Sequence, residues 1–537
     1  MGQLYGKLRS VLAVATALPL VACLSGGGGG NSGTTSSAVG PAPGTCSSVT
    51  YAAPSGAANN IVFTFDKAYT CGQFANGDWW VSKDANPSVT ITSITPTASG
   101  GENGFEVNPS SKTQQAFDSN AAVAYNAGLM PALPLSLTGV SSVVKAVSMP
   151  VSGLPELRFA AVLTVVDAPI SNSSEVFRPG YFGTAGKTFY SVPTAATIAA
   201  LPVGTYTPVG VPSAAGFSIA SIATRYQHVQ LDHSPVTPGR DLHPADNMPD
   251  YGAEIATDNA VYLLRMLLSD FNYSNASAKQ ALINYLQMAI DFKSITAGGH
   301  TYGADAGHGL GRRLPLMFAN MVFGGTDFSS AIAVTSFSED QQIWRSGVTG
   351  EVLWGKPPFG DPVLDYWKTT RIALGDATAG TGGAKDVRDP YGRIDGGGYQ
   401  VGITSEYQAC CTSMPWKYTV LAQYMLGLTT PPTTIPNAAN DNMAEYVERW
   451  VRYGYKAADT TTNINLTTGI ITPVAHGVPA CARPAVPSAA VFLTDFGSVG
   501  AGPCIVGANN WVVVDNSSAD SGGYGSTFGN ELWAWYR

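Results

Sequence analysis

Short hydrophobic runs, rich in β-branched and aromatic residues, characterise the first part of the chain. They lie at residues 61–65, 79–82, 89–94, 135–147 and 159–166. Gly, Pro, Asn and Ser separate the runs, as is typical of β-strands joined by turns. Their number and spacing predict an N-terminal β-sandwich domain over residues 46–224.

From Asp258 onwards the hydrophobic positions recur every three or four residues, which is the period of an amphipathic helix. This pattern predicts helices near residues 260–271, 281–290, 315–323, 415–427 and 440–455. Helices in successive pairs favour an α/α helical domain, an incomplete toroid, over residues 225–465. Residues 466–537 return to short runs, at 511–514 and 532–536, which predict a small β-rich region. The fold class expected is therefore multidomain α+β.

The N-terminal residues have the pattern of an export signal. Lys7 and Arg9 precede an apolar stretch over residues 11–22, and residues 20–23 read Leu-Val-Ala-Cys. This ending resembles the lipobox of bacterial lipoproteins, which implies a signal peptide over residues 1–23 and a lipid on Cys23. A Gly/Ser-rich tether over residues 24–45 follows. We therefore expect attachment to the bacterial cell envelope, at the outer membrane, facing the periplasm or the surface.

Charge and cysteine content limit the partners and the compartment. Of the 537 residues only 12% are charged, and the net charge is −8, which argues against nucleic acid as a partner. Without Cys23, six cysteines remain, and an oxidising compartment favours two disulfides, Cys46 with Cys71 and Cys481 with Cys504. The adjacent Cys410 and Cys411 form either a vicinal disulfide or two buried thiols.

The main candidate site is the glycine-rich run over residues 297–315, which places polar side chains among six glycines. Its candidate residues are His300, Tyr302, Asp305, His308, Arg312 and Arg313. Dense glycine marks tight turns or close backbone approach, and a loop between helices is a common place for a site. The alternative is a structural loop whose polar side chains satisfy neighbouring backbone groups.

Other polar segments could contribute to the same site. Residues 225–254 contain His243 and Asp250 among several histidines and aspartates, but they show no recognisable zinc-ligand spacing. We expect no cofactor, although a divalent metal stays open, and a connector with bridging polar groups is the alternative. Arg393 lies in a glycine-rich stretch over residues 375–402. Trp80, next to Trp79, is a candidate for stacking on a sugar or for packing at a domain interface.

Four motifs carry a family resemblance. They are residues 71–80 (CGQFANGDWW), 177–181 (FRPGY), 307–312 (GHGLGR) and 407–412 (YQACCT). Together they resemble an uncharacterised group of exported bacterial lipoproteins, a likeness that names no activity. A β domain beside an α/α toroid also resembles, in architecture, polysaccharide lyases that degrade alginate and heparin.

The resulting hypothesis is a carbohydrate-active enzyme that acts on a polysaccharide, most concretely a lyase that cleaves a uronic-acid polymer by β-elimination. That reaction needs a cation, a base and an acid. Arg312 and Arg313 would supply the cation, His308 or His300 the base, and Tyr302 or Tyr407 the acid. One alternative is a glycoside hydrolase that uses Asp305 with Asp250 or Asp395. Another is a noncatalytic glycan-binding lipoprotein.

Overall fold

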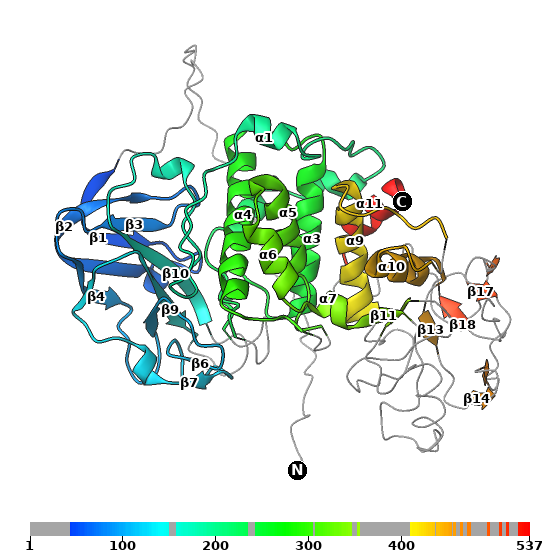
Figure 1. Cartoon of the computed structure of the whole chain (residues 1–537), viewed down its shortest axis with the longest axis horizontal. Coiled ribbons are helices and arrows are strands. Elements are labelled where there is room, and N and C mark those ends of the chain that lie inside the picture. Colours follow the sequence, from blue (N-terminus) through cyan, green and yellow to red (C-terminus); the bar gives the residue numbers. More distant parts are fainter. Residues whose placement is uncertain are drawn as a thin grey trace, which may run out of the picture. The chain divides into compact units, whose positions relative to one another are not determined.

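The computed structural model describes most of the chain between residues 43 and 537. The described ranges are 43–149, 157–234, 242–303, 307–345, 352–354, 409–434 and 437–453, several short strands between 455 and 514, and 525–537. Strands come first and helices follow, so the predicted mixed α+β class is confirmed (Figure 1).

One eight-stranded sheet accounts for most of the strand-rich part. Its strands are β1 (Gly44–Tyr51), β2 (Ile61–Gln73), β3 (Trp79–Ser82), β4 (Val89–Thr95), β5 (Phe105–Val107), β8 (Leu135–Leu137), β9 (Ser141–Ser148) and β10 (Leu157–Val166). The order is β5-β9-β10-β3-β2-β4-β8, and β1 pairs with β2. Neighbouring strands are antiparallel except β3 and β10, which are parallel. The predicted run over 135–147 is divided into β8 and β9.

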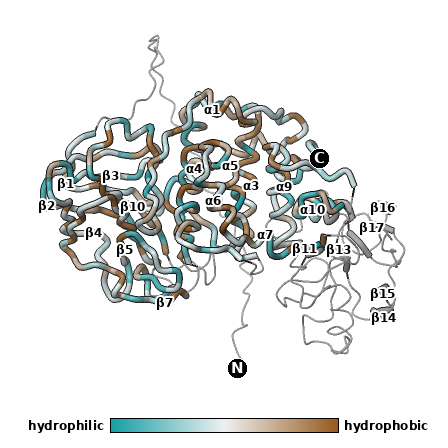
Figure 2. Tube along the Cα trace, viewed as in Figure 1, coloured by the Kyte–Doolittle hydropathy of each residue, from teal (hydrophilic) through white to brown (hydrophobic). Residues whose placement is uncertain are grey.

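Strand β10 contributes side chains to two hydrophobic cores, one on each of its faces. Phe159, Ala161 and Leu163 point into one hydrophobic core, formed among the strands. Ala160 and Val162, which face the other way, belong to the core that contains the helices. A strand buried on both faces reads as a nearly continuous apolar run, and in β10 only Arg158 and Thr164 interrupt it. Hydrophobic and hydrophilic stretches alternate along the elements in Figure 2, as expected where each element has a buried side.

The disulfide between Cys46 and Cys71 is confirmed, with the Cα atoms 5.9 Å apart. It joins β1 to β2, whose residues pair in antiparallel register. The bond therefore fixes the start of the described chain to the sheet.

The predicted helices are all present, with slightly different bounds. They are α3 (Gly252–Leu267), α4 (Ala276–Ala297), α5 (Arg313–Phe323), α9 (Met414–Met425) and α10 (Asn442–Tyr453). Asn275 caps α4, since its side chain accepts hydrogen bonds from the backbone N–H groups of Ser277 and Ala278. Helix α3 packs against α9, and α4 packs against α5.

Further elements are shorter. The helices are α1 (Ala195–Ala199), α2 (Ile219–Arg225), α6 (Asp327–Val334), α7 (Ser338–Gln341) and a π-helix (Ala409–Ser413). The strands are β6 (Gln114–Gln115), β7 (Ala124–Tyr125), β11 (Ile343–Arg345), β12 (Val352–Trp354), β13 (Tyr455–Ala457), β14 (Thr462–Asn465), β15 (Ile470–Pro473), β16 (Val491–Leu493), β17 (Cys504–Val506) and β18 (Val512–Val514).

The strand expected at residues 532–536 is wrong, because this segment belongs to helix α11 (Thr527–Tyr536). Ser526 caps the helix by accepting from the N–H of Gly529. Phe528, Leu532 and Trp533 are buried, at a spacing that a helix places on one side. Trp533, Trp535 and Tyr536 gave the run the aromatic composition that is typical of a strand.

Candidate functional site

The glycine-rich loop between α4 and α5 is held by close backbone contacts. Gly311 has a φ of +90°, and a Cβ there would lie 2.4 Å from the Cα of Ala256 in α3. A Cβ on Gly252, the first residue of α3, would lie 1.9 Å from the carbonyl oxygen of His308. These glycines therefore let the loop lie directly on the N-terminal part of α3.

Three of the predicted catalytic residues come together, but in the interior. The rings of His300 and Tyr302 have centroids 4.5 Å apart, and the Cζ of Arg312 lies 5.4 Å from the centroid of the Tyr302 ring. Their exposed fractions are 1%, 0% and 0%. None of them offers an accessible surface to a polymer, which corrects the expectation that they line an open site.

A buried ion pair explains the position of Arg312. Its Nε and Nη2 donate to the two carboxylate oxygens of Asp232 at 2.6 and 3.0 Å. Its Nη1 donates to the carbonyl oxygens of His308, at 3.0 Å, and Leu310. The guanidinium therefore satisfies the loop backbone and is neutralised by a carboxylate, so its role here is structural.

Tyr181 connects this ion pair to a second buried pair, between Arg178 and Asp291. Its hydroxyl oxygen lies 3.0 Å from Nδ1 of His233 and accepts from the backbone N–H of Asp232 at 3.3 Å. Its own N–H donates to Asp291 at 3.3 Å. Burial lowers the pKa of His233 to about 4 and, together with nearby positive charge, that of His300 to about 3. Both imidazoles are therefore neutral at physiological pH.

His308 lies on the other side of the loop and is half-buried. Its ring makes an edge-to-face contact with Tyr251, with centroids 4.9 Å apart and an interplanar angle of 87°. Asp250, the neighbour of Tyr251, is also half-buried, whereas His243 is buried. His308 is thus the predicted catalytic histidine that solvent can reach.

An open pocket of about 300 Å³ begins one residue beyond Arg312. Its lining is Arg313, Asp340, Ile343, Asn440, Asp441, Asn442 and Met443. Arg313, a predicted substrate-binding residue, donates to Asp340 at 2.6 Å. Partial desolvation and repulsion from Asp441 raise the pKa of Asp340, although Arg313 opposes the shift.

Asp441 occupies the N-cap position of α10. Its side chain accepts from the backbone N–H of Ala444 at 2.9 Å, and its carbonyl oxygen accepts from Glu445. The positive end of the helix dipole favours a negative charge there. No sequence pattern predicted that Asp340 and Asp441 line one pocket, because 100 residues lie between them and each also fits an ordinary helix terminus.

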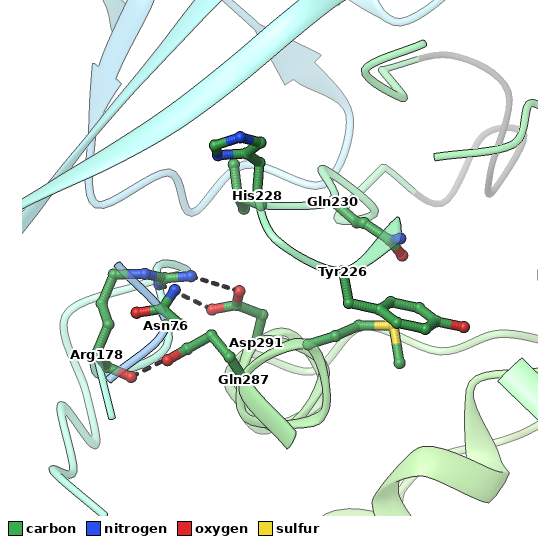
Figure 3. Close-up of a pocket in the computed structure, with 9 residues that line it drawn as sticks. Asn76, Arg178, Tyr226, His228, Gln230, Gln287 and Asp291 are labelled. Atoms are coloured by element: carbon green, nitrogen blue, oxygen red, sulfur yellow. Dashed lines mark hydrogen bonds and ion pairs between the residues drawn. The ribbon is translucent and has the colours of Figure 1, made fainter. Parts of the chain in front are cut away.

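A second cavity, of about 10 Å³, lies between the sheet and α4 and has room for about one water molecule (Figure 3). Asn76, Arg178, Tyr226, His228, Gln230, Gln287 and Asp291 contribute to its lining. Arg178 lies beside Asp291 on one side, and His228 and Gln230 lie on the other. A polymer chain cannot enter so small a space.

Trp80 is a core residue rather than a sugar platform. It is fully buried, and a Cβ on Gly72 would lie 2.7 Å from its indole. Its neighbour Trp79 is half-buried and donates from Nε1 to the carbonyl oxygen of Thr50 at 3.1 Å. The exposed and buried sides of the strand thus separate the two rings.

Several predicted residues lie outside the described residues. They are Asp305, Tyr407, Arg393, Asp395, Cys23 and Cys481, while Cys504 lies in β17 without a described side chain. Cys411 is disulfide-bonded, so the alternative of a reduced thiol does not hold for it.

Within the described part of the chain, no group of three or more His, Cys, Asp or Glu side chains is arranged to hold a metal ion. A search of the same residues found no helix with the length and apolar character needed to cross a bilayer. Comparisons with protein-family models, curated proteins and solved structures found no match.

Proposed function

We propose that this protein is a carbohydrate-active enzyme that acts on a polysaccharide, and that it hydrolyses glycosidic bonds with two carboxylates. The observation that carries the proposal is the presence of Asp340 and Asp441 in one open, polar pocket. Glycoside hydrolysis needs one carboxyl group that holds a proton and one that is ionised. Asp340, with its raised pKa, suits the general acid, and Asp441, at the N-terminus of α10, suits the base or nucleophile.

Hydrolysis is favoured over β-elimination because Arg312, one of the two cations expected for elimination, is fully buried against a carboxylate. Arg312 is buried against Asp232, and Arg313 is bonded to Asp340. A lyase needs a cation that is available to the carboxylate of the substrate. Elimination would retain His308 as its base and is the second outcome that the experiment below detects.

The placement of the protein in the cell is part of the same proposal. A lipid on Cys23 and the tether over residues 24–45 would hold the enzyme at the outer membrane, where polysaccharides are accessible. We also propose that the helices belong to an incomplete α/α toroid and that the sheet region is a sandwich. Hydrolysis at the pocket does not depend on either detail.

The test is a polysaccharide panel with two readouts, new reducing ends and the ultraviolet absorbance of unsaturated uronate ends. We expect reducing ends without that absorbance. Asp340→Asn and Asp441→Asn should each lower the rate by at least about 100-fold. Asp167→Asn, at an exposed carboxylate paired with Lys83, is the matched control and should leave the rate unchanged.

Thermal melting of all three variants separates a loss of catalysis from a loss of folding. Appearance of the ultraviolet absorbance would show that the protein cleaves by elimination rather than by hydrolysis. Binding without either product would leave a noncatalytic glycan-binding protein, and full activity in both pocket variants would place the reaction elsewhere.

A further inference from the structure

The pocket between α7 and α10 has an excess of negative charge. Among the described residues, its lining contains one cation, Arg313, and two carboxylates, Asp340 and Asp441. Arg313 is bonded to Asp340 at 2.6 Å, so the charge of Asp441 stays uncompensated by that pair. The neighbouring Arg345 does not change the balance, because it is bonded to Glu445 at 2.9 and 3.2 Å.

Several hydrogen-bonding groups of the pocket are acceptors. The amide nitrogen of Asn440 donates to the carbonyl oxygen of Thr434 at 2.8 Å and to Glu445 at 2.9 Å. Its amide oxygen is therefore the atom that suits a ligand. The carboxylates of Asp340 and Asp441 add further acceptors. Asn442, whose oxygen accepts from Arg345 at 3.0 Å, contributes a donor.

The size of the pocket fits one sugar unit. About 300 Å³ is at the lower end of the range, roughly 300–1,000 Å³, in which small ligands bind. Ile343 and Met443 supply apolar contacts for the carbon face of a pyranose ring. A uronate would bring its own carboxylate towards Asp441 in this pocket, and like charges repel.

We infer that the pocket selects a sugar unit that carries a protonated amino group, so that the polymer is an amino-sugar polysaccharide rather than a polyuronate. This inference rests on the proposed function for its assumption that the ligand is a sugar. An ammonium group donates three hydrogen bonds and carries one positive charge, which complements the acceptor oxygens of Asn440, Asp340 and Asp441 and the negative charge of the carboxylates. The uronic-acid polymer expected from the sequence has the opposite charge.

The experiment compares the binding of glucosamine, glucose and glucuronate to the full-length protein by NMR titration. It is run at neutral pH and low salt, where the amine of glucosamine is largely protonated, Asp340 is ionised in its pair with Arg313, and charges are weakly screened. Glucosamine should bind more tightly than glucose by about 2- to 5-fold, which is the effect of one solvent-accessible ion pair. Glucuronate should bind more weakly than glucose.

Asp441→Asn is the decisive variant. Asparagine is as good an N-cap as aspartate, so α10 keeps its hydrogen bond to Ala444 while the pocket loses one negative charge. The preference for glucosamine over glucose should disappear. In the double variant with Asp340→Asn the pocket keeps only the positive charge of Arg313, so the preference should shift towards glucuronate. Asp167→Asn should change neither preference.

Equal binding of glucosamine and glucose would overturn the inference, and so would a preference that survives in Asp441→Asn. The two proposals fail in different ways. Charge-dependent binding without cleavage of any polysaccharide would retain the pocket's selectivity and reject the enzyme. Cleavage of a polyuronate that depends on Asp340 and Asp441 would retain the enzyme and reject the amino sugar.

Discussion

Arg178 donates two parallel hydrogen bonds to Asp291 in α4, at 2.9 and 2.6 Å. Its Nε donates to Asp78, in the turn before β3, at 2.6 Å. The Arg178 and Asp291 side chains are 0% and 3% exposed. The sheet and α4 are therefore joined by one guanidinium that bonds to a carboxylate from each.

Removing this guanidinium should be costly. Arg178→Ala leaves Asp78 and Asp291 buried without their cation, and breaking a buried ion pair typically costs about 3–5 kcal/mol. We expect a loss of that size in the free energy of unfolding, measured by urea denaturation. Arg178→Lys should recover part of it, since lysine keeps the charge but not the bidentate geometry.

Lys83→Ala is the control for Arg178, because the Lys83–Asp167 pair is partly exposed and its atoms are 3.5 Å apart. A surface pair contributes about 0–1 kcal/mol. If Arg178→Ala were no more destabilising than Lys83→Ala, the idea that this cation joins the sheet to α4 would have to be abandoned.

The buried Glu106 in β5 should give the free energy of unfolding an unusual pH dependence. Burial raises its pKa from 4.5 to about 7, although a hydrogen bond from the N–H of Ala116 opposes the shift. The folded protein therefore holds this proton more tightly than the unfolded chain, and its stabilising contribution is lost as pH rises towards 7. Glu106→Gln keeps an acceptor for Ala116 and has no charge to bury.

The stability of Glu106→Gln relative to the parent should therefore increase between pH 4.5 and 7, by at most about 3 kcal/mol. His233 and His300 have lowered pKa values and produce the opposite slope, but they do so in both proteins and cancel in the difference. The measurement is urea denaturation of both proteins across this pH range. A difference that stays constant with pH would show that Glu106 does not titrate in this way.

The sequence predicted those elements that follow from local periodicity. Helix α4 has regular apolar positions and a capping asparagine, and β3 has the predicted bounds of residues 79–82. The helix at Leu532 was missed because its short aromatic run has no clear period. Whether such a run becomes a helix or a strand depends on packing against distant residues. Local pattern is thus sufficient only where burial repeats along a single element.

The candidate site was harder to predict, because it depends on which distant residues meet. Glycine density identified a loop that lies close to other backbone, but the same closeness places Tyr302 and Arg312 inside the protein. The carboxylate that neutralises Arg312 belongs to Asp232, far earlier in the chain, and the pair of Asp340 and Asp441 forms only after folding. Residue type alone does not separate a buried arginine from an accessible one.

The Cys46–Cys71 disulfide should contribute substantially to stability. It closes a loop between residues separated by 25 positions, which in the chain-entropy model corresponds to about 3.5 kcal/mol. The double substitution of Cys46 and Cys71 by alanine should lower the free energy of unfolding by that amount, measured under oxidising conditions. A reductant should lower the free energy of unfolding of the parent by breaking this bond. The alanine variant does not contain the bond and cannot lose stability in this way. Equal stability of the two proteins would count against the prediction.

The final prediction compares His308 with Arg312, which lie in the same loop but in different surroundings. Arg312→Ala would leave Asp232 buried and unpaired and remove the donors to the carbonyl oxygens of His308 and Leu310, so we expect a loss of about 3–5 kcal/mol. His308→Ala removes a half-buried ring whose edge contact with Tyr251 contributes about 0.5–1.5 kcal/mol. Thermal melting should therefore separate the two variants clearly.

On the polysaccharide that the panel identifies, His308→Ala should retain cleavage, since the two carboxylates of the pocket perform the proton transfers. A folded His308→Ala variant without activity would instead assign the base to this histidine and favour elimination over hydrolysis.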